Sequence, residues 1–100
     1  MTEAQALSVN SGQMKFGVGH IYITANALQV LTEEDTREAL RRHMSGDWGD
    51  VGAEDWQWNN QALEHGTRLL SSYESTKGQK FWVITEADRL QTTILLPEDY

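Results

Sequence analysis

The sequence predicts an α+β fold in which a three-stranded antiparallel meander packs against two main helices. Three observations lead to this prediction. Before Gly66, the chain contains capped segments whose apolar residues have helical spacing. After Gly66, apolar and polar residues alternate with a period of two. Turn residues divide this later part into short runs rich in β-branched and aromatic residues. The length of 100 residues is that of one common domain, so we expect a single domain over residues 1–100.

The region before the first main helix carries the weakest signals. Residues 1–13 mix small and polar side chains without a period, and we expect them to form a weakly ordered arm. Apolar residues at Phe16, Val18 and 21–23, with glycines between them, predict a short extra strand. Thr24 is suited to cap a short helical turn after this strand.

Two later stretches carry clear helix signals. Thr32 is followed by three acids, and arginines and a histidine occupy the last turn, so a helix is predicted over residues 33–44. Ala53 opens a second helix, which we expect to reach His65 and to end at Gly66. These two helices would form one layer of the fold.

The last third of the chain has the pattern of a sheet. Residues 69–74 alternate, residues 75–78 form a hairpin-type turn, and residues 81–85 and 92–96 supply two further strands. The middle strand carries apolar residues on both faces, which indicates a strand covered on both sides.

Composition restricts the classes of partner. The formal net charge of −7 opposes a phosphate backbone, whose binding depends on Lys and Arg, so direct nucleic-acid binding is not expected. The same charge suits a protein partner with a basic surface, and an ordinary role in keeping the chain soluble is the alternative. The chain has no cysteine, which excludes disulfides, thiolate metal sites and thiol nucleophiles.

Localisation follows from similar arguments. The absence of cysteine fits a reducing compartment. No stretch approaches the roughly 20 apolar residues that span a membrane, and the N-terminus lacks the pattern of a secretion signal. We therefore expect a cytoplasmic protein without membrane contact.

Residues 32–65 form an acidic and aromatic segment, with nine of the fifteen acids and three of the four tryptophans against three arginines. Rigid aromatic side chains supply contact area, and a field of one sign steers a partner of opposite charge. Trp82 is assigned to the core and the other tryptophans are expected to be partly exposed; at least one of Trp56 and Trp58 must lie at the edge of the core or outside it, because residues two apart on a helix diverge. The predicted partner-binding residues are Asp47, Trp48, Asp50, Glu54, Asp55, Trp56 and Trp58.

Residue types that carry chemistry are present without the spacing that chemistry requires. The three histidines show no zinc-ligand spacing, and two of them, His43 and His65, fall in last helical turns, where a positive charge is favoured. A calcium loop starting at Asp47 would place Gly49 and Val51 where its third and fifth ligands belong. We predict no metal, no cofactor and no catalytic residue; a small hydrolase or transferase with an unrecognised site is the alternative.

From Ser45 onward the chain contains phrases in a fixed order and spacing: Ser45-Gly46-Asp47-Trp48-Gly49-Asp50, Glu54-Asp55, residues 59–63, residues 81–89 and residues 92–97, with Tyr100 at the end. In these phrases it is similar to a family of small, uncharacterised proteins carried by bacterial plasmids, phages and integrated elements. Members are often labelled plasmid-related, or as a modification subunit (subunit M) of type I restriction systems. The chain has neither a methyl-donor glycine motif nor an Asn-Pro-Pro-Tyr-type tetrad, so methyltransferase activity is not expected of it.

The resemblance implies a genomic setting. A small acidic protein of a mobile element is expected to antagonise host defence, as an anti-CRISPR or anti-restriction protein that masks the basic surface of a CRISPR effector or restriction complex in the bacterial cytoplasm. An accessory or regulatory module of the element itself, contacting its own proteins through an exposed sheet edge, is the alternative. The sequence departs from the family's usual pattern in the N-terminal arm and at Trp56 and Trp58, where more polar residues would be expected. A lineage-specific contact is expected at these places.

Overall fold

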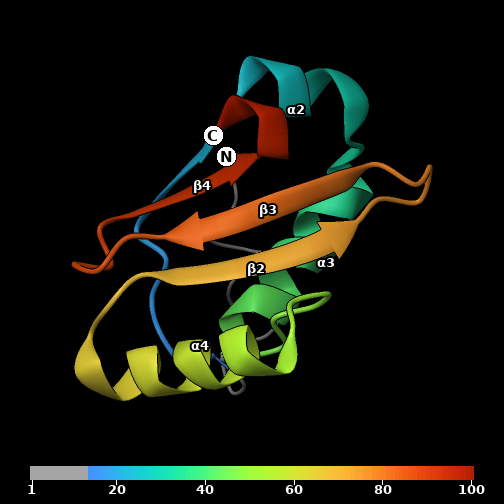
Figure 1. The fold of residues 1–100 in the computed structure, drawn as a ribbon. Helices are drawn as coiled ribbons and strands as arrows, with labels where there is room; N and C mark the ends of the chain where they lie inside the picture. The colour runs from blue at the N-terminus through green and yellow to red at the C-terminus, as the bar shows by residue number, and fades with distance from the viewer. Residues whose placement is uncertain (1–13) are drawn as a thin grey trace.

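The computed structural model describes residues 14–100 and has an α+β fold (Figure 1). The predicted class and both main helices are confirmed, and the arm predicted for residues 1–13 lies outside the described residues. The elements in chain order are β1 (His20–Ile23), α2 (Ala25–Val30), α3 (Glu33–Met44), α4 (Ala53–His65), β2 (Leu69–Glu74), β3 (Lys80–Thr85), β4 (Gln91–Leu95) and a short 3-10 helix, η2 (Pro97–Asp99).

The sheet contains four strands in the order β1-β4-β3-β2. Strands β2, β3 and β4 form the predicted antiparallel meander. The extra strand β1 pairs with β4 in parallel, with Ile21 opposite Thr92 and Ile23 opposite Ile94, so the sheet is mixed and the purely antiparallel description was incomplete. Three helices separate β1 from β2 in the chain, and this long connection lets the chain return beside β4 in the parallel sense.

Local capping explains where α3 begins. The Asp35 amide donates to Thr32 Oγ1, and the Thr32 amide donates to Asp35 Oδ2, both at 3.0 Å. This reciprocal pair satisfies two of the amides that every helix leaves unpaired at its N-terminus. A polar signal visible in the sequence therefore determines the residue at which α3 begins.

The two faces of the sheet have different surroundings. Helix α3 passes behind the sheet in Figure 1, Ala27 of α2 packs in the core on that same side, and no α-helix of the described chain crosses the front. Phe81 and Val83 point into the main core on the helix side. Trp82 points to the other face, where it is partly exposed and packs edge-on against Tyr100 at 5.7 Å. No helix covers the face of β3 that carries Trp82, and the assignment of Trp82 to the core is therefore wrong.

Buried apolar residues on the front face explain that error. Ile84 faces the same side as Trp82, yet only 2% of it is exposed. Its neighbours across the sheet include Leu70 on β2 and Thr93 on β4. Side chains of adjacent strands can bury such a residue without a second helical layer, so an apolar pattern on both faces does not require two covered faces.

The outer edge of β2 is closed by groups that do not belong to a strand. The Asn59 side chain of α4 donates to the Leu70 carbonyl at 2.8 Å and accepts from the Leu70 amide at 3.1 Å. Two residues along, the Ser72 amide donates to the Trp48 carbonyl at 3.1 Å, and the Asp50 amide donates to the Ser72 carbonyl at 2.7 Å. This arrangement attaches α4 and the preceding loop to the sheet.

Candidate functional site

Trp48 is a core residue and is not available to a partner. It is 0% exposed, and its ring stacks on Phe16 at 6.1 Å and meets His43 edge-on at 5.7 Å. Its indole Nε1 donates to Asn60 Oδ1 at 3.0 Å. The partial exposure predicted for Trp48 is wrong because the loop before α4 pairs with β2 and carries the indole between helix and sheet. Trp48 and Trp82 have thus exchanged their predicted environments.

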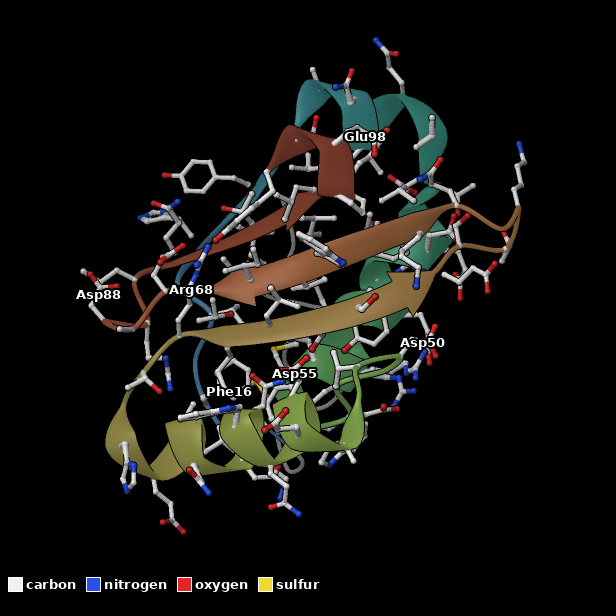
Figure 2. The ribbon with its side chains drawn as sticks, viewed as in Figure 1. Phe16, Asp50, Asp55, Arg68, Asp88 and Glu98 are labelled. Atoms are coloured by element: carbon white, nitrogen blue, oxygen red, sulfur yellow. The ribbon has the colours of Figure 1, made fainter. Side chains whose placement is uncertain are left out.

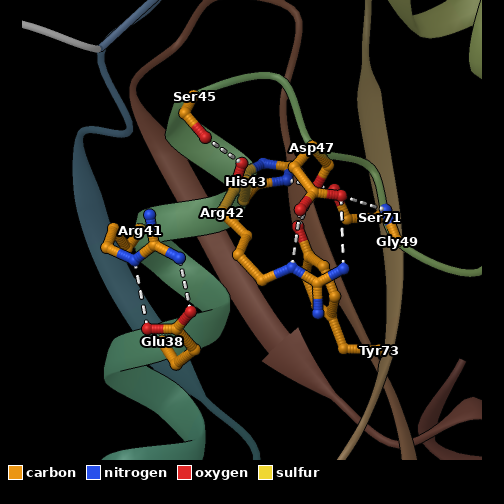
Figure 3. Close-up of polar contacts among 9 residues, drawn as sticks. All are labelled: Glu38, Arg41, Arg42, His43, Ser45, Asp47, Gly49, Ser71 and Tyr73. Atoms are coloured by element: carbon orange, nitrogen blue, oxygen red, sulfur yellow. Dashed lines mark hydrogen bonds and ion pairs between the residues drawn. The ribbon is translucent and has the colours of Figure 1, made fainter.

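Asp47 is engaged within the chain (Figure 3). Arg42 Nε donates to Asp47 Oδ2 at 2.8 Å and Arg42 Nη2 donates to Oδ1 at 3.2 Å, while the Gly49 amide donates to Oδ1 at 3.1 Å. The Tyr73 hydroxyl donates to the Asp47 carbonyl at 2.6 Å. The hydrogen bonds from Arg42 lower the pKa of the Asp47 carboxyl below its usual value. Asp47 therefore shapes the turn and presents little free charge.

Four of the five remaining predicted residues are exposed and lie around the start of α4. Asp50, Glu54 and Asp55 are exposed, and Trp58 is 65% exposed. Glu54 and Asp55 precede Trp58 by four and three residues, so all three lie on one side of the helix. Figure 2 shows Asp50 and Asp55 at this end of α4, below β2. We call these four residues the α4 patch.

Trp56 belongs to the core side of α4. It is partly buried and packs against the cluster of Trp48, Ala62 and Leu69. The prediction that at least one of Trp56 and Trp58 lies outside the core is confirmed, and Trp58 is the exposed one.

The charge of the α4 patch is not neutralised by an ion pair. Among residues 14–100, the ion pairs join Arg37 to Glu34, Arg41 to Glu38, Arg42 to Asp47 and Arg68 to Glu86, and none includes a carboxylate of the patch. Part of its acidity is explained by Glu54 and Asp55 in the first turn of α4, where the helix dipole favours negative charge. The dipole does not explain the large exposed tryptophan beside them.

A buried hydrogen-bonded chain centred on His43 was missed by sequence reasoning. His43 Nδ1 lies 2.6 Å from Ser71 Oγ, and His43 Nε2 lies 2.9 Å from Thr85 Oγ1. Thr85 Oγ1 lies 2.7 Å from Thr92 Oγ1, and the Thr92 hydroxyl donates to the Val18 carbonyl at 2.8 Å. His43, Ser71, Thr85 and Thr92 are all 0% exposed.

The chain of partners fixes the protons of this network. The Thr92 hydroxyl donates its proton to the Val18 carbonyl, so Thr92 Oγ1 accepts a hydrogen bond from the Thr85 hydroxyl. Thr85 Oγ1 in turn accepts a hydrogen bond from His43 Nε2. His43 Nδ1 then carries no proton and accepts a hydrogen bond from the Ser71 hydroxyl. Burial lowers the pKa of His43 to about 3, and the positive charge of Arg89 acts in the same direction. The helix-end cation predicted for His43 is therefore wrong: this imidazole is neutral.

The pair of His43 and Ser71 has the spacing of a base and a nucleophile, but it has no access for a substrate. Both side chains are fully buried between α3 and the sheet, and no atom of the pair reaches the surface. Its hydrogen bonds join α3 to β2 and, through Thr85, to β3. The only signal in the sequence was the polar residues at inward positions of three strands.

Within the part of the chain that the structure describes, no group of three or more His, Asp or Glu side chains is arranged to hold a metal ion. In that same part, every helix is too short or too polar to cross a bilayer. Comparisons with models of protein families, with curated proteins and with solved structures found no match.

Proposed function

We propose that this protein is a non-enzymatic inhibitor that binds a basic protein surface through the α4 patch and thereby masks it. The proposal depends on the exposure of Trp58, of which 65% is accessible to solvent. The carboxylates beside it in the α4 patch have no ion-pair partner within residues 14–100. The resemblance described above leads us to propose a CRISPR effector or a restriction complex of a bacterial host as the target.

Physical arguments support this mode of binding. A large aromatic side chain on a helix loses little entropy when it enters a pocket, and such residues supply much of the energy of protein interfaces. Carboxylates around it guide the approach of a basic partner and define its orientation. The formal net charge of −7 extends this field over the molecule.

The proposal is tested with two variants of equal charge. In the first, Asp50, Glu54 and Asp55 are changed to Lys and Trp58 to Ala; in the second, three exposed acids elsewhere, Glu74, Asp88 and Glu98, are changed to Lys. Asp47 is left unchanged because it pairs with Arg42. The measurement is phage plating on hosts with an active CRISPR or restriction system, each expressing one version of the chain.

We expect the parent chain and the second variant to restore plating, and the first variant to lose at least about tenfold of this effect. Binding to the captured complex should weaken steeply as salt rises, because exposed charges are screened. Equal activity of both variants would overturn the role of the α4 patch. Failure of the parent chain on every defence system would overturn the target.

A further inference from the structure

The edge of the sheet formed by β1 is open, in contrast to that formed by β2. No strand of the described chain lies beyond β1. The amides of His20 and Thr24 donate to carbonyl oxygens on the β4 side, each at 3.0 Å. Since the direction of main-chain groups alternates along a strand, the amides and carbonyls of Ile21 and Ile23 point away from β4.

This open edge is held in place at both ends. Gly19 has φ of +63°, and a Cβ there would lie 2.3 Å from the main-chain carbonyl carbon of Leu90, so the chain passes very close to the β3–β4 turn. At the other end, Thr24 Oγ1 donates to Asp99 Oδ2 at 2.6 Å and Asn26 donates to Asp99 Oδ1 at 2.8 Å. A strand fixed in advance lowers the entropic cost of pairing with another segment.

A groove runs beside the same edge on the helix side of the sheet. Its volume is about 490 Å³, within the range of ligand-binding clefts. Leu28 of α2 lines it and is 64% exposed. Glu33, at the start of α3, is the one carboxylate among its lining residues in the described chain, and no Lys or Arg joins it. The other apolar residues along it are Ile21, Ile23, Leu31, Leu40 and Ile94.

We propose that this edge and groove bind an extended segment of a partner protein by strand addition. The segment would pair with the main chain of Ile21 and Ile23 and place every second side chain in the groove. These inward side chains would be apolar, and a Lys or Arg of the segment would lie against Glu33. The outward side chains would pass beside Tyr22, which is 52% exposed on the front face.

Charge favours a basic peptide over a second copy of this chain. Two copies paired through β1 would bring together molecules of formal charge −7 and would place the carboxylates at the starts of both α3 helices near the same interface. A segment that carries Lys or Arg removes that repulsion. The inference does not rest on the α4 patch, because β1 and β2 are opposite edges of the sheet.

The test begins with a display library of random peptides about 10 residues long, selected on the full chain. We expect selected peptides to alternate apolar residues and to include Lys or Arg. A synthetic peptide of the selected sequence should bind at least about tenfold more weakly to Leu28→Lys than to the parent. Val30→Lys serves as the matched control, because Val30 is an exposed apolar residue of the same helix outside the groove lining.

Amide hydrogen exchange distinguishes strand addition from binding of side chains alone. On peptide binding, the amides of Ile21 and Ile23 should exchange at least about tenfold more slowly, whereas that of Tyr22 should change little. A bound peptide that leaves Ile21 and Ile23 unchanged would overturn the proposal, as would the absence of any selected peptide.

Two further outcomes would assign the edge to another occupant and would also overturn the proposal. Protection of Ile21 and Ile23 that rises with protein concentration alone, together with a dimer in sedimentation, would indicate a second copy. Protection in the dilute, free chain that is lost when residues 1–13 are removed would indicate that segment as the occupant.

Discussion

The two edges of the sheet solve the same physical problem in different ways. An edge strand exposes main-chain donors and acceptors, which are a template for unwanted pairing. At β2, the side-chain amide of Asn59 pairs with the outward main-chain amide and carbonyl of Leu70. The loop at 48–50 pairs with those of Ser72. At β1, the described chain leaves the outward groups of the strand without a neighbour.

This difference indicates where the molecule can accept a partner. A closed edge adds stability and excludes other chains, whereas an open edge that is already rigid and lies beside an apolar groove is suited to binding. The alternative of an accessory module that contacts proteins through a sheet edge would therefore have to use β1.

The largest expected effect is the opening of the closed edge at Gly49. A Cβ at this position would lie 2.1 Å from the Ser72 carbonyl oxygen, and Gly49 has φ of +77°, which other residues adopt only with strain. We expect Gly49→Ala to lower the free energy of unfolding by more than about 3 kcal/mol, measured in urea.

Gly52→Ala provides the control for this substitution. Gly52 lies three residues further along the same loop, and a Cβ there would meet nothing within 4 Å. The free energy of unfolding of the Gly52→Ala protein should stay within about 1 kcal/mol of the parent value. A Gly49→Ala protein as stable as Gly52→Ala would mean that the loop can leave β2 at little cost.

A smaller effect is expected at Asn59. Asn59→Ala removes both hydrogen bonds to Leu70 and leaves a main-chain donor and acceptor unsatisfied, so the free energy of unfolding should fall by about 2 to 3 kcal/mol. Exchange of the Leu70 amide should become faster at the same time. Gln61→Ala, at an exposed position of the same helix, should change neither quantity. Unaltered exchange at Leu70 would show that another group closes this edge.

Much of the fold was predictable because local signals determine it. Thr32 and its acids mark the start of α3, and the period of two marks the meander. The closed edge was not predictable, because the polar side chain of Asn59 meets Leu70 only after α4 has packed beside β2. The parallel partner of β1 was likewise invisible, since pairing between distant segments leaves no local pattern.

The candidate site was predictable only in part. Exposed acids follow from composition, and the divergence of Trp56 and Trp58 follows from helix geometry. The exchange of Trp48 and Trp82 did not follow, because burial depends on which layer covers each residue. A tryptophan among acids can lie in the core when its loop pairs with a strand, and a tryptophan in a central strand can face solvent when helices cover one side.

The smallest predicted effect concerns the hydrogen-bonded chain that links the closed edge to the open one. It runs from Ser71 on β2 through His43, Thr85 and Thr92 to the carbonyl of Val18, just before β1. This series of hydrogen bonds requires a neutral imidazole, because a second proton on the ring would meet the proton of the Ser71 hydroxyl or force that hydroxyl to turn. Acid should therefore weaken the connection between the two edges.

The sign of the pH dependence follows from the pKa of His43, which burial lowers from 6.5 to about 3. Below about pH 6.5 the unfolded chain binds a proton at this residue and the folded chain does not, so the contribution to stability is complete above that pH and is lost as the pH falls toward 3. Between pH 7 and pH 5 the free energy of unfolding should fall by about 2 kcal/mol. In His43→Gln, which cannot take up this proton, urea titrations should give a much flatter dependence over the same interval, even though the variant is less stable throughout. Parallel curves for the two proteins would mean that His43 titrates alike in the folded and unfolded chains, and that the two edges are not joined through a neutral imidazole.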